Sequence, residues 1–182
     1  MKDIQTAQRA LDRLKTGNAH YLTARQNPGD ISPALRRQTC AEGQAPYAVI
    51  VTCADSRVVP EAIFSAGLGE LFVIRVAGNV IAQHELGSIQ YAAEHLGTPL
   101  VVVMGHTHCG AVGAAIQGPQ QGPVESITWQ IRQAIGAETD DYKACCLNVR
   151  GGVATIQKEL PLPGVRVCGA VYHIEDGRVE FL

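Results

Sequence analysis

The chain has 182 residues, of which 46% are hydrophobic and 18% are charged, and its formal net charge at pH 7 is −2. This is an ordinary globular composition, and the length suffices for one domain with its own core. Because the net charge is small and no long run of like charges occurs, neither nucleic acid nor an anionic membrane is an expected partner.

The hydrophobic residues are spread through the chain rather than gathered in one segment. No apolar run approaches the roughly eighteen residues that a membrane span needs. The first residues, Met1 to Gln5, lack the apolar core of a signal peptide. We therefore expect a cytoplasmic, reduced protein, in which the six cysteines indicate metal binding, catalysis or burial rather than disulfides.

The N-terminal part of the chain predicts helices. Apolar residues at helical spacing predict a helix over residues 3–16 that stops at Gly17, followed by a second short helix over 18–24. The pair Ser32-Pro33 is typical of a helix start, and this helix is expected to end near Gly43.

From residue 44 onward, strands alternate with helices. Strands are expected at 47–52, 71–75, 100–104, 165–174 and 178–181. Helices are expected at 60–64, 85–96, 109–116, 124–135 and 140–160, although Gly151-Gly152 weakens the last of them.

This alternation predicts an α/β fold with a mainly parallel sheet flanked by helices. The segment Glu175-Asp176-Gly177 is a hairpin signal, so the last two strands should form an antiparallel C-terminal edge. We expect a single domain over residues 1–182, with a helical N-terminal arm at 1–43 and an α/β core at 44–182.

Two clusters of chemically active side chains follow two of the expected strands. Cys53-Ala54-Asp55-Ser56-Arg57 follows the strand at 47–52, and His106-Thr107-His108-Cys109-Gly110 follows the strand at 100–104. In open α/β sheets, ligands bind at the carboxyl ends of the strands. Two cysteines and one histidine are suited to zinc, and three protein ligands with one open position are typical of catalytic zinc.

The two clusters resemble the signature of the β-class carbonic anhydrases, Cys-x-Asp-Ser-Arg followed later by His-x-x-Cys. Further segments resemble the family in family order: Gly43-Gln44-x-Pro46, Glu70-Leu71-Phe72-Val73-x-Arg75, Ala77-Gly78-Asn79 and Gly87-Ser88-Ile89-x-Tyr91-Ala92. The resemblance is dense from about residue 14 to residue 116 and thin from 117 to 160.

The resemblance implies one zinc ion per chain, held by Cys53, His106 and Cys109. It also implies reversible hydration of carbon dioxide to bicarbonate and a proton by a zinc-bound hydroxide, with Asp55 and Arg57 as the catalytic pair. An arginine fork can hold a carboxylate through two hydrogen bonds, which keeps Asp55 ionised and off the metal. In some relatives the aspartate becomes the fourth zinc ligand and closes the site.

Four further residues are expected to bind substrate. Gln44, Phe72 and Tyr91 resemble pocket residues of the family, and the family's equivalents of Gln44 and Tyr91 face the metal of a neighbouring subunit. Gly110 permits close approach of the backbone to substrate. The resemblance therefore implies a homodimer or a higher homo-oligomer, and the presence of Gln44 favours an open zinc site.

Several alternatives are open at this point. Phe72 and Tyr91 are equally consistent with core packing, and the N-terminal helix with folding onto its own core or across a partner subunit. The same ligands suit hydrolysis of carbonyl sulfide or carbon disulfide, or a non-catalytic zinc-stabilised module that binds bicarbonate. Cys145 and Cys146 are interpreted as buried apolar residues. His108 is interpreted as a residue around the metal ligands or at an interface rather than as a proton relay.

Overall fold

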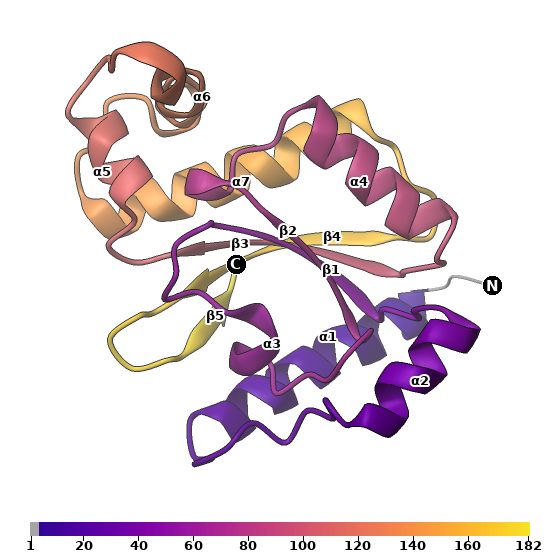
Figure 1. The fold of residues 1–182 in the computed structure, drawn as a ribbon. Helices are drawn as coiled ribbons and strands as arrows, with labels where there is room; N and C mark the ends of the chain where they lie inside the picture. Colours follow the sequence, from indigo (N-terminus) through magenta and orange to yellow (C-terminus); the bar gives the residue numbers. More distant parts are fainter. Residues whose placement is uncertain (1–3) are drawn as a thin grey trace.

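A computed structural model describes residues 4–182 and shows a five-stranded sheet in the order β2-β1-β3-β4-β5 (Figure 1). The strands are β1 Ala48–Thr52, β2 Leu71–Arg75, β3 Leu100–His106, β4 Arg166–Tyr172 and β5 Val179–Phe181. The pairs among β1 to β4 are parallel, whereas β5 runs antiparallel to β4. The mainly parallel sheet with an antiparallel C-terminal edge is confirmed.

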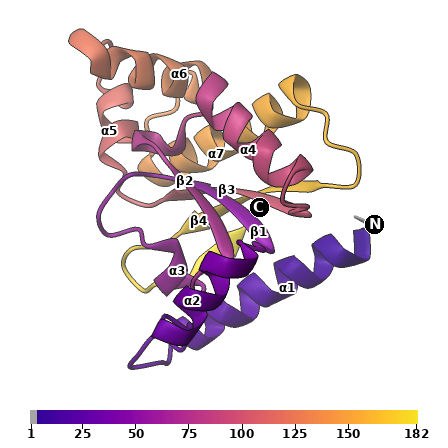
Figure 2. The same ribbon diagram turned by 45° about the vertical axis from the view of Figure 1, so that its right-hand side comes forward.

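Helices cover both faces of this sheet. They are α1 Ile4–Tyr21, α2 Pro33–Glu42, α3 Pro60–Ile63, α4 Gln83–Glu94, α5 Gly110–Ile116, α6 Glu125–Ile135 and α7 Asp141–Glu159, with short 3-10 turns η1 Ala77–Asn79 and η2 Gly122–Val124. Figure 1 shows α4 and α7 on one face and α1 and α3 on the other. Helices α5 and α6 pack together and against α7 beyond one end of the sheet (Figure 2).

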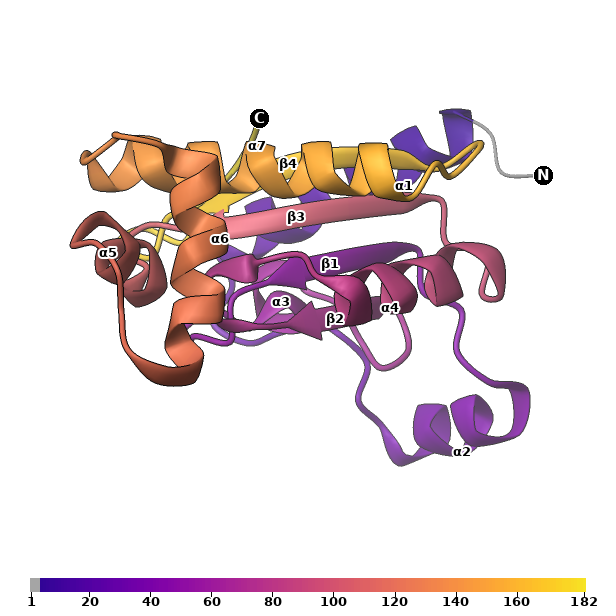
Figure 3. The ribbon, with the colours of Figure 1, turned by 90° about the horizontal axis from the view of Figure 1, so that it is seen from above.

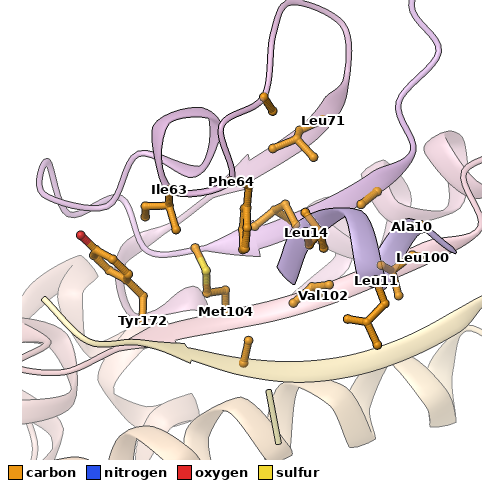
Figure 4. Close-up of a cluster of buried hydrophobic side chains, with 14 of the residues drawn as sticks. Ala10, Leu11, Leu14, Ile63, Phe64, Leu71, Leu100, Val102, Met104 and Tyr172 are labelled. Atoms are coloured by element: carbon orange, nitrogen blue, oxygen red, sulfur yellow. The ribbon is translucent and has the colours of Figure 1, made fainter. Parts of the chain in front are cut away.

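The central strands are buried on both faces, which explains their unbroken apolar sequence. Alternate residues point to opposite sides, as the strand period of two requires. Ile50, Val102 and Met104 pack with Leu14 and Phe64 on the side of α1 and α3 (Figure 4). The intervening residues pack beneath α4 and α7, and they are Val49, Val51, Val101 and Val103.

The N-terminal helix differs from the prediction. Instead of stopping at Gly17 with a second helix after it, α1 continues without a break to Tyr21. The predicted first residue of this helix, Asp3, lies outside the described residues. Gly17 serves close packing rather than termination, because a Cβ atom there would lie 1.9 Å from the carbonyl oxygen of Phe64. Backbone contact between α1 and the end of α3 therefore requires glycine at this position.

This contact yields a stability prediction. Gly17→Ala is expected to lower the free energy of unfolding by about 1–3 kcal/mol, because the added methyl group must push α1 away from Phe64. In α5 a Cβ atom on Gly113 meets nothing within 4 Å, so Gly113→Ala is the control and should be neutral or stabilising. Urea denaturation of the two variants checks this, and a Gly17→Ala protein as stable as the wild type would contradict it.

Contacts with neighbouring elements explain two further features of the helices and strands. Helix α7 was expected over 140–160 and is found at Asp141–Glu159, running through Gly151-Gly152 without interruption. Glycine is needed at Gly151 because a Cβ there would lie 2.7 Å from the Cβ of Ala134 in α6. The two glycines thus allow α7 to approach its neighbours. Strand β3 extends to His106 rather than ending at residue 104, because it pairs with β4 as far as His106 and Tyr172.

The two N-terminal helices pack differently. The apolar stripe of α1, including Leu11 and Leu14, is buried in the core of its own chain. By contrast, α2 contains no buried residue, although Ser32 caps it by accepting a hydrogen bond from the Leu35 amide at 3.2 Å. Figure 3 shows α2 standing away from the sheet. Folding onto its own core therefore describes α1, and α2 is the segment that lacks a partner surface.

Within residues 4–182, none of the helices combines the length and the apolar character that crossing a membrane requires.

Candidate metal centre

Three potential ligands converge at the carboxyl ends of β1 and β3. Cys53 directly follows β1, His106 is the last residue of β3, and Cys109 is the N-cap of α5. Because β1 and β3 are paired up to Thr52 and Met104, Cys53 is brought beside the end of β3. The two sulfur atoms and an imidazole nitrogen lie within 4.8 Å of one another, and all three residues are buried.

The histidine is oriented as a metal ligand. Its Nδ1 lies 2.9 Å from the carbonyl oxygen of Thr107, to which it donates as the Nδ1–H tautomer. The other ring nitrogen, Nε2, is buried and has no hydrogen-bond partner. A buried unpaired nitrogen is costly. A backbone acceptor on one ring nitrogen with the other left free is the usual arrangement of a zinc-bound histidine. The residues present therefore fit a zinc ion.

The thiols are also prepared for metal binding. The backbone amides of Asp55 and Gly78 donate to the sulfur of Cys53 at 3.4 and 3.3 Å. The contact with the thiol of Cys109 is the largest effect, and it lowers the pKa of Cys53 while raising the pKa of Cys109. Cys53 is therefore the thiol that ionises more readily, and the thiolate is the form that binds metal.

Asp55 lies beside the ligands in a two-pronged pair with Arg57. Its Oδ1 accepts from Arg57 Nε at 3.0 Å and its Oδ2 from Arg57 Nη2 at 2.8 Å. These hydrogen bonds hold the pKa of Asp55 well below its usual range, against the opposing effect of burial. The same Oδ2 lies 3.9 Å from His106 Nε2. An ionised carboxylate is therefore fixed next to the metal-binding atoms.

Two residues that were not expected to belong to the site support these groups. Arg75, at the end of β2, donates to the carbonyl oxygens of Cys53 at 3.3 Å and Asp55 at 2.7 Å. The buried thiol of Cys145 donates to the carbonyl oxygen of His106 at 3.1 Å, so it contributes more than the apolar packing expected of it. The role of Arg75 could have been predicted from its position at the end of a strand parallel to β1. No local feature of the sequence predicted the contact of Cys145 with His106.

A model of the carbonic anhydrase family matches residues 48–179, more than half of the chain. The chain belongs to the carbonic anhydrase family. A carbonic anhydrase of Mycolicibacterium smegmatis is 37% identical over 185 residues, covering 92% of this chain and 89% of the relative. Carbonic anhydrase 2 of Mycobacterium tuberculosis is 49% identical over 110 residues, covering 60% of this chain and 52% of the relative.

Solved structures assign the fold to the β class of carbonic anhydrases. One of two β-carbonic anhydrases of Sordaria macrospora, described as tetrameric, matches with a TM-score of 0.72 at 24% identity over 82% of this chain and 87% of that one. The Coccomyxa β-carbonic anhydrase in complex with acetazolamide matches with a TM-score of 0.69 at 23% identity over 98% and 84%. The predicted fold, family and enzyme class are confirmed.

The chain does not bring all of its expected site residues together. Gln44 precedes β1, whereas Cys53 follows it, so the two lie at opposite ends of that strand. Phe72 and Tyr91 lie near each other, with ring centroids 6.3 Å apart, and Phe72 is paired with Val49 near the start of β1. Phe72 is half-buried beneath α4 and Tyr91 is 49% exposed.

Of the expected substrate-binding residues, one lies at the metal centre of its own chain. Gly110 is the first residue of α5, directly after Cys109, and a Cβ atom there would meet nothing within 4 Å. Open space thus adjoins the metal ligands at this position.

Proposed function

We propose that the protein catalyses the reversible hydration of carbon dioxide to bicarbonate and a proton at a zinc ion held by Cys53, His106 and Cys109. The observation that carries this proposal is the buried, unpartnered Nε2 of His106, which faces two thiols beside the ionised Asp55. Zinc bound there would supply a Lewis acid that lowers the pKa of a coordinated water. Membership of the carbonic anhydrase family supports the choice of reaction.

The chain's own residues orient the reacting water. The Asp55 carboxylate can only accept hydrogen bonds, because Arg57 keeps it ionised. A water beside the ligands would therefore donate one hydrogen to Asp55, which directs an oxygen lone pair toward carbon dioxide. Arg57 prevents Asp55 from turning, because it holds both carboxylate oxygens. This arrangement supports an open site, in which Asp55 is not a metal ligand.

We also propose that the functional unit is at least a two-fold dimer. Gln44 precedes β1, and the five residues of β1 span about 17 Å at 3.3 Å per residue, so Gln44 cannot reach the zinc ligands of its own chain. In a two-fold dimer, Gln44 and Tyr91 of each chain can instead meet the metal centre of the other. The uncovered helix α2 supports the presence of such a partner.

Analytical ultracentrifugation tests the dimer. A species of at least twice the 19.4 kDa chain mass is expected at the concentrations used for activity measurements. The matched activity measurement covers a dilution series, in which specific activity should fall as the dimer dissociates. A monomer that retains full specific activity would contradict the proposal.

A stopped-flow assay tests the reaction. The zinc-loaded protein is expected to hydrate carbon dioxide much faster than buffer does and to turn over carbonyl sulfide poorly. The complete Asp55–Arg57 pair already disfavours a non-catalytic module. If the protein turned over carbonyl sulfide faster than carbon dioxide, carbonyl sulfide would be the substrate instead. If the zinc-loaded protein were inactive toward both gases, it would be a non-catalytic binding module.

A further inference from the structure

The loop that carries two of the three metal ligands has an unusual backbone turn. Between His106 and Cys109, residue His108 has a φ of +55°, in the left-handed region that residues other than glycine seldom adopt. Such conformations persist only where the surroundings impose them. The turn lies between the end of β3 and the start of α5, so it sets the relative positions of the two ligands.

Two carboxylates from distant elements hold this loop. Asp141 is the first residue of α7, and its Oδ2 accepts a hydrogen bond from the backbone N–H of His108 at 3.0 Å. Glu175 lies in the turn between β4 and β5, and each of its two carboxylate oxygens contacts a different residue of the loop. Its Oε2 accepts the Thr107 hydroxyl at 2.8 Å, and its Oε1 lies 2.7 Å from His108 Nε2.

The contact with the hairpin turn continues through the backbone. The Thr107 hydroxyl accepts the amide of Ile174 at 3.0 Å, and the Thr107 amide donates to the carbonyl oxygen of Tyr172 at 3.0 Å. On its other side the loop meets the catalytic pair, because Arg57 Nη2 donates to the carbonyl oxygen of His108 at 3.3 Å. The loop is therefore fixed between the hairpin, α7 and Arg57.

We propose that Asp141 and Glu175 are positioning residues that hold the His106–Cys109 loop in its left-handed turn and so preorganise the metal site. Neither residue belongs to the ligand set, and both act through the backbone and through Thr107 and His108. Exposed ion pairs contribute little, and His108, Asp141 and Glu175 are all partly exposed. Hydrogen-bond acceptance, rather than negative charge, is therefore the property that the loop requires. This inference rests on the proposed zinc site.

The test measures zinc affinity of the metal-free protein by competition with a chromophoric chelator. Asp141→Ala and Glu175→Ala are each expected to weaken zinc binding by about 10-fold, the lower end of the loss seen when a direct partner of a metal ligand is removed, because both residues act through Thr107 and His108 rather than on a ligand. Asp141→Asn and Glu175→Gln keep an acceptor oxygen and should restore affinity close to that of the wild type. Cobalt substitution provides a second readout, because the d–d absorption band reports ligand geometry.

Asp176→Ala is the matched control, since Asp176 lies in the same turn but accepts the amide of Arg178 rather than any group of the ligand loop. It should bind zinc like the wild type. Circular dichroism of each metal-free variant establishes that it is folded. Wild-type affinity and cobalt spectra in both alanine variants would overturn the positioning role. Equal losses in Glu175→Ala and Glu175→Gln would overturn it as well, because charge would then be the cause. A wild-type protein without zinc affinity would instead overturn the proposed function.

Discussion

Cys53→Ser is expected to abolish both zinc binding and hydration of carbon dioxide. The Cys53 sulfur is central to the site, since it accepts hydrogen bonds from two backbone amides and contacts the thiol of Cys109. A serine hydroxyl is not a thiolate at neutral pH, so the metal would lose one of its two soft ligands. Elemental analysis should find close to no zinc per chain, and stopped-flow rates should fall to the buffer background.

The stability of the variant separates metal loss from misfolding. Zinc at about 1,000 times its Kd stabilises a folded protein by about 4 kcal/mol, so added zinc should raise the unfolding midpoint of the wild type but not that of Cys53→Ser. Cys40→Ser is the matched control, because Cys40 is a free, exposed cysteine on α2. It should keep its zinc and its activity. A Cys53→Ser protein with full metal and full activity would refute the ligand assignment.

Arg57→Ala is expected to keep zinc but to lose most of the activity. Without the guanidinium, both oxygens of Asp55 lose their side-chain partner, and the pKa of Asp55 rises toward its ordinary value because the largest cause of its depression is removed. Asp55 is then free to turn onto the metal and close the site. Misplacing a reacting group by about 1 Å can cost roughly 100-fold in rate, so a fall of that order is expected in kcat/KM.

Arg57→Lys discriminates between charge and geometry. Lysine keeps the positive charge but lacks the planar fork that engages both carboxylate oxygens, so its activity should lie between those of the wild type and Arg57→Ala. X-ray absorption at the zinc edge at pH 8 provides the structural readout. An Asp55 oxygen should enter the coordination sphere in Arg57→Ala only. The same oxygen in the wild type would contradict the open site, and unchanged kcat/KM in Arg57→Ala would contradict the role of the pair.

Much of this fold follows from local sequence, because strand and helix signals are local. Strand β2 was predicted at its observed bounds, and β1 within one residue. The two ligand clusters were predicted to meet because both follow parallel strands, and the pairing of β1 with β3 brings them together. Periodicity, strand-end position and residue type were sufficient for these features.

Features that depend on distant contacts were not predictable in the same way. The low helix propensity of Gly17 predicted a helix end at that position. Glycine is instead required there because the backbone of Phe64 packs against it. Cys145 indicated an ordinary apolar residue, whereas its thiol meets the backbone of His106. The contacts of Asp141 and Glu175 with the ligand loop span 33 and 68 positions of the chain. No spacing rule connects such residues, because the fold alone brings them together.

The pairing of β1 with β3 also determines the stage of folding at which zinc can bind. Cys53 and His106 become neighbours only after the two central strands have paired, so no short segment of the unfolded chain contains the complete site. The complete ligand set therefore cannot form before these two strands pair, so metal loading is expected to follow formation of the sheet. Its exchange depends on local opening of the surface loops, whereas the buried strands open only in global unfolding. A chain that loses its zinc is therefore expected to keep its sheet, because the central strands are buried among apolar side chains from both faces.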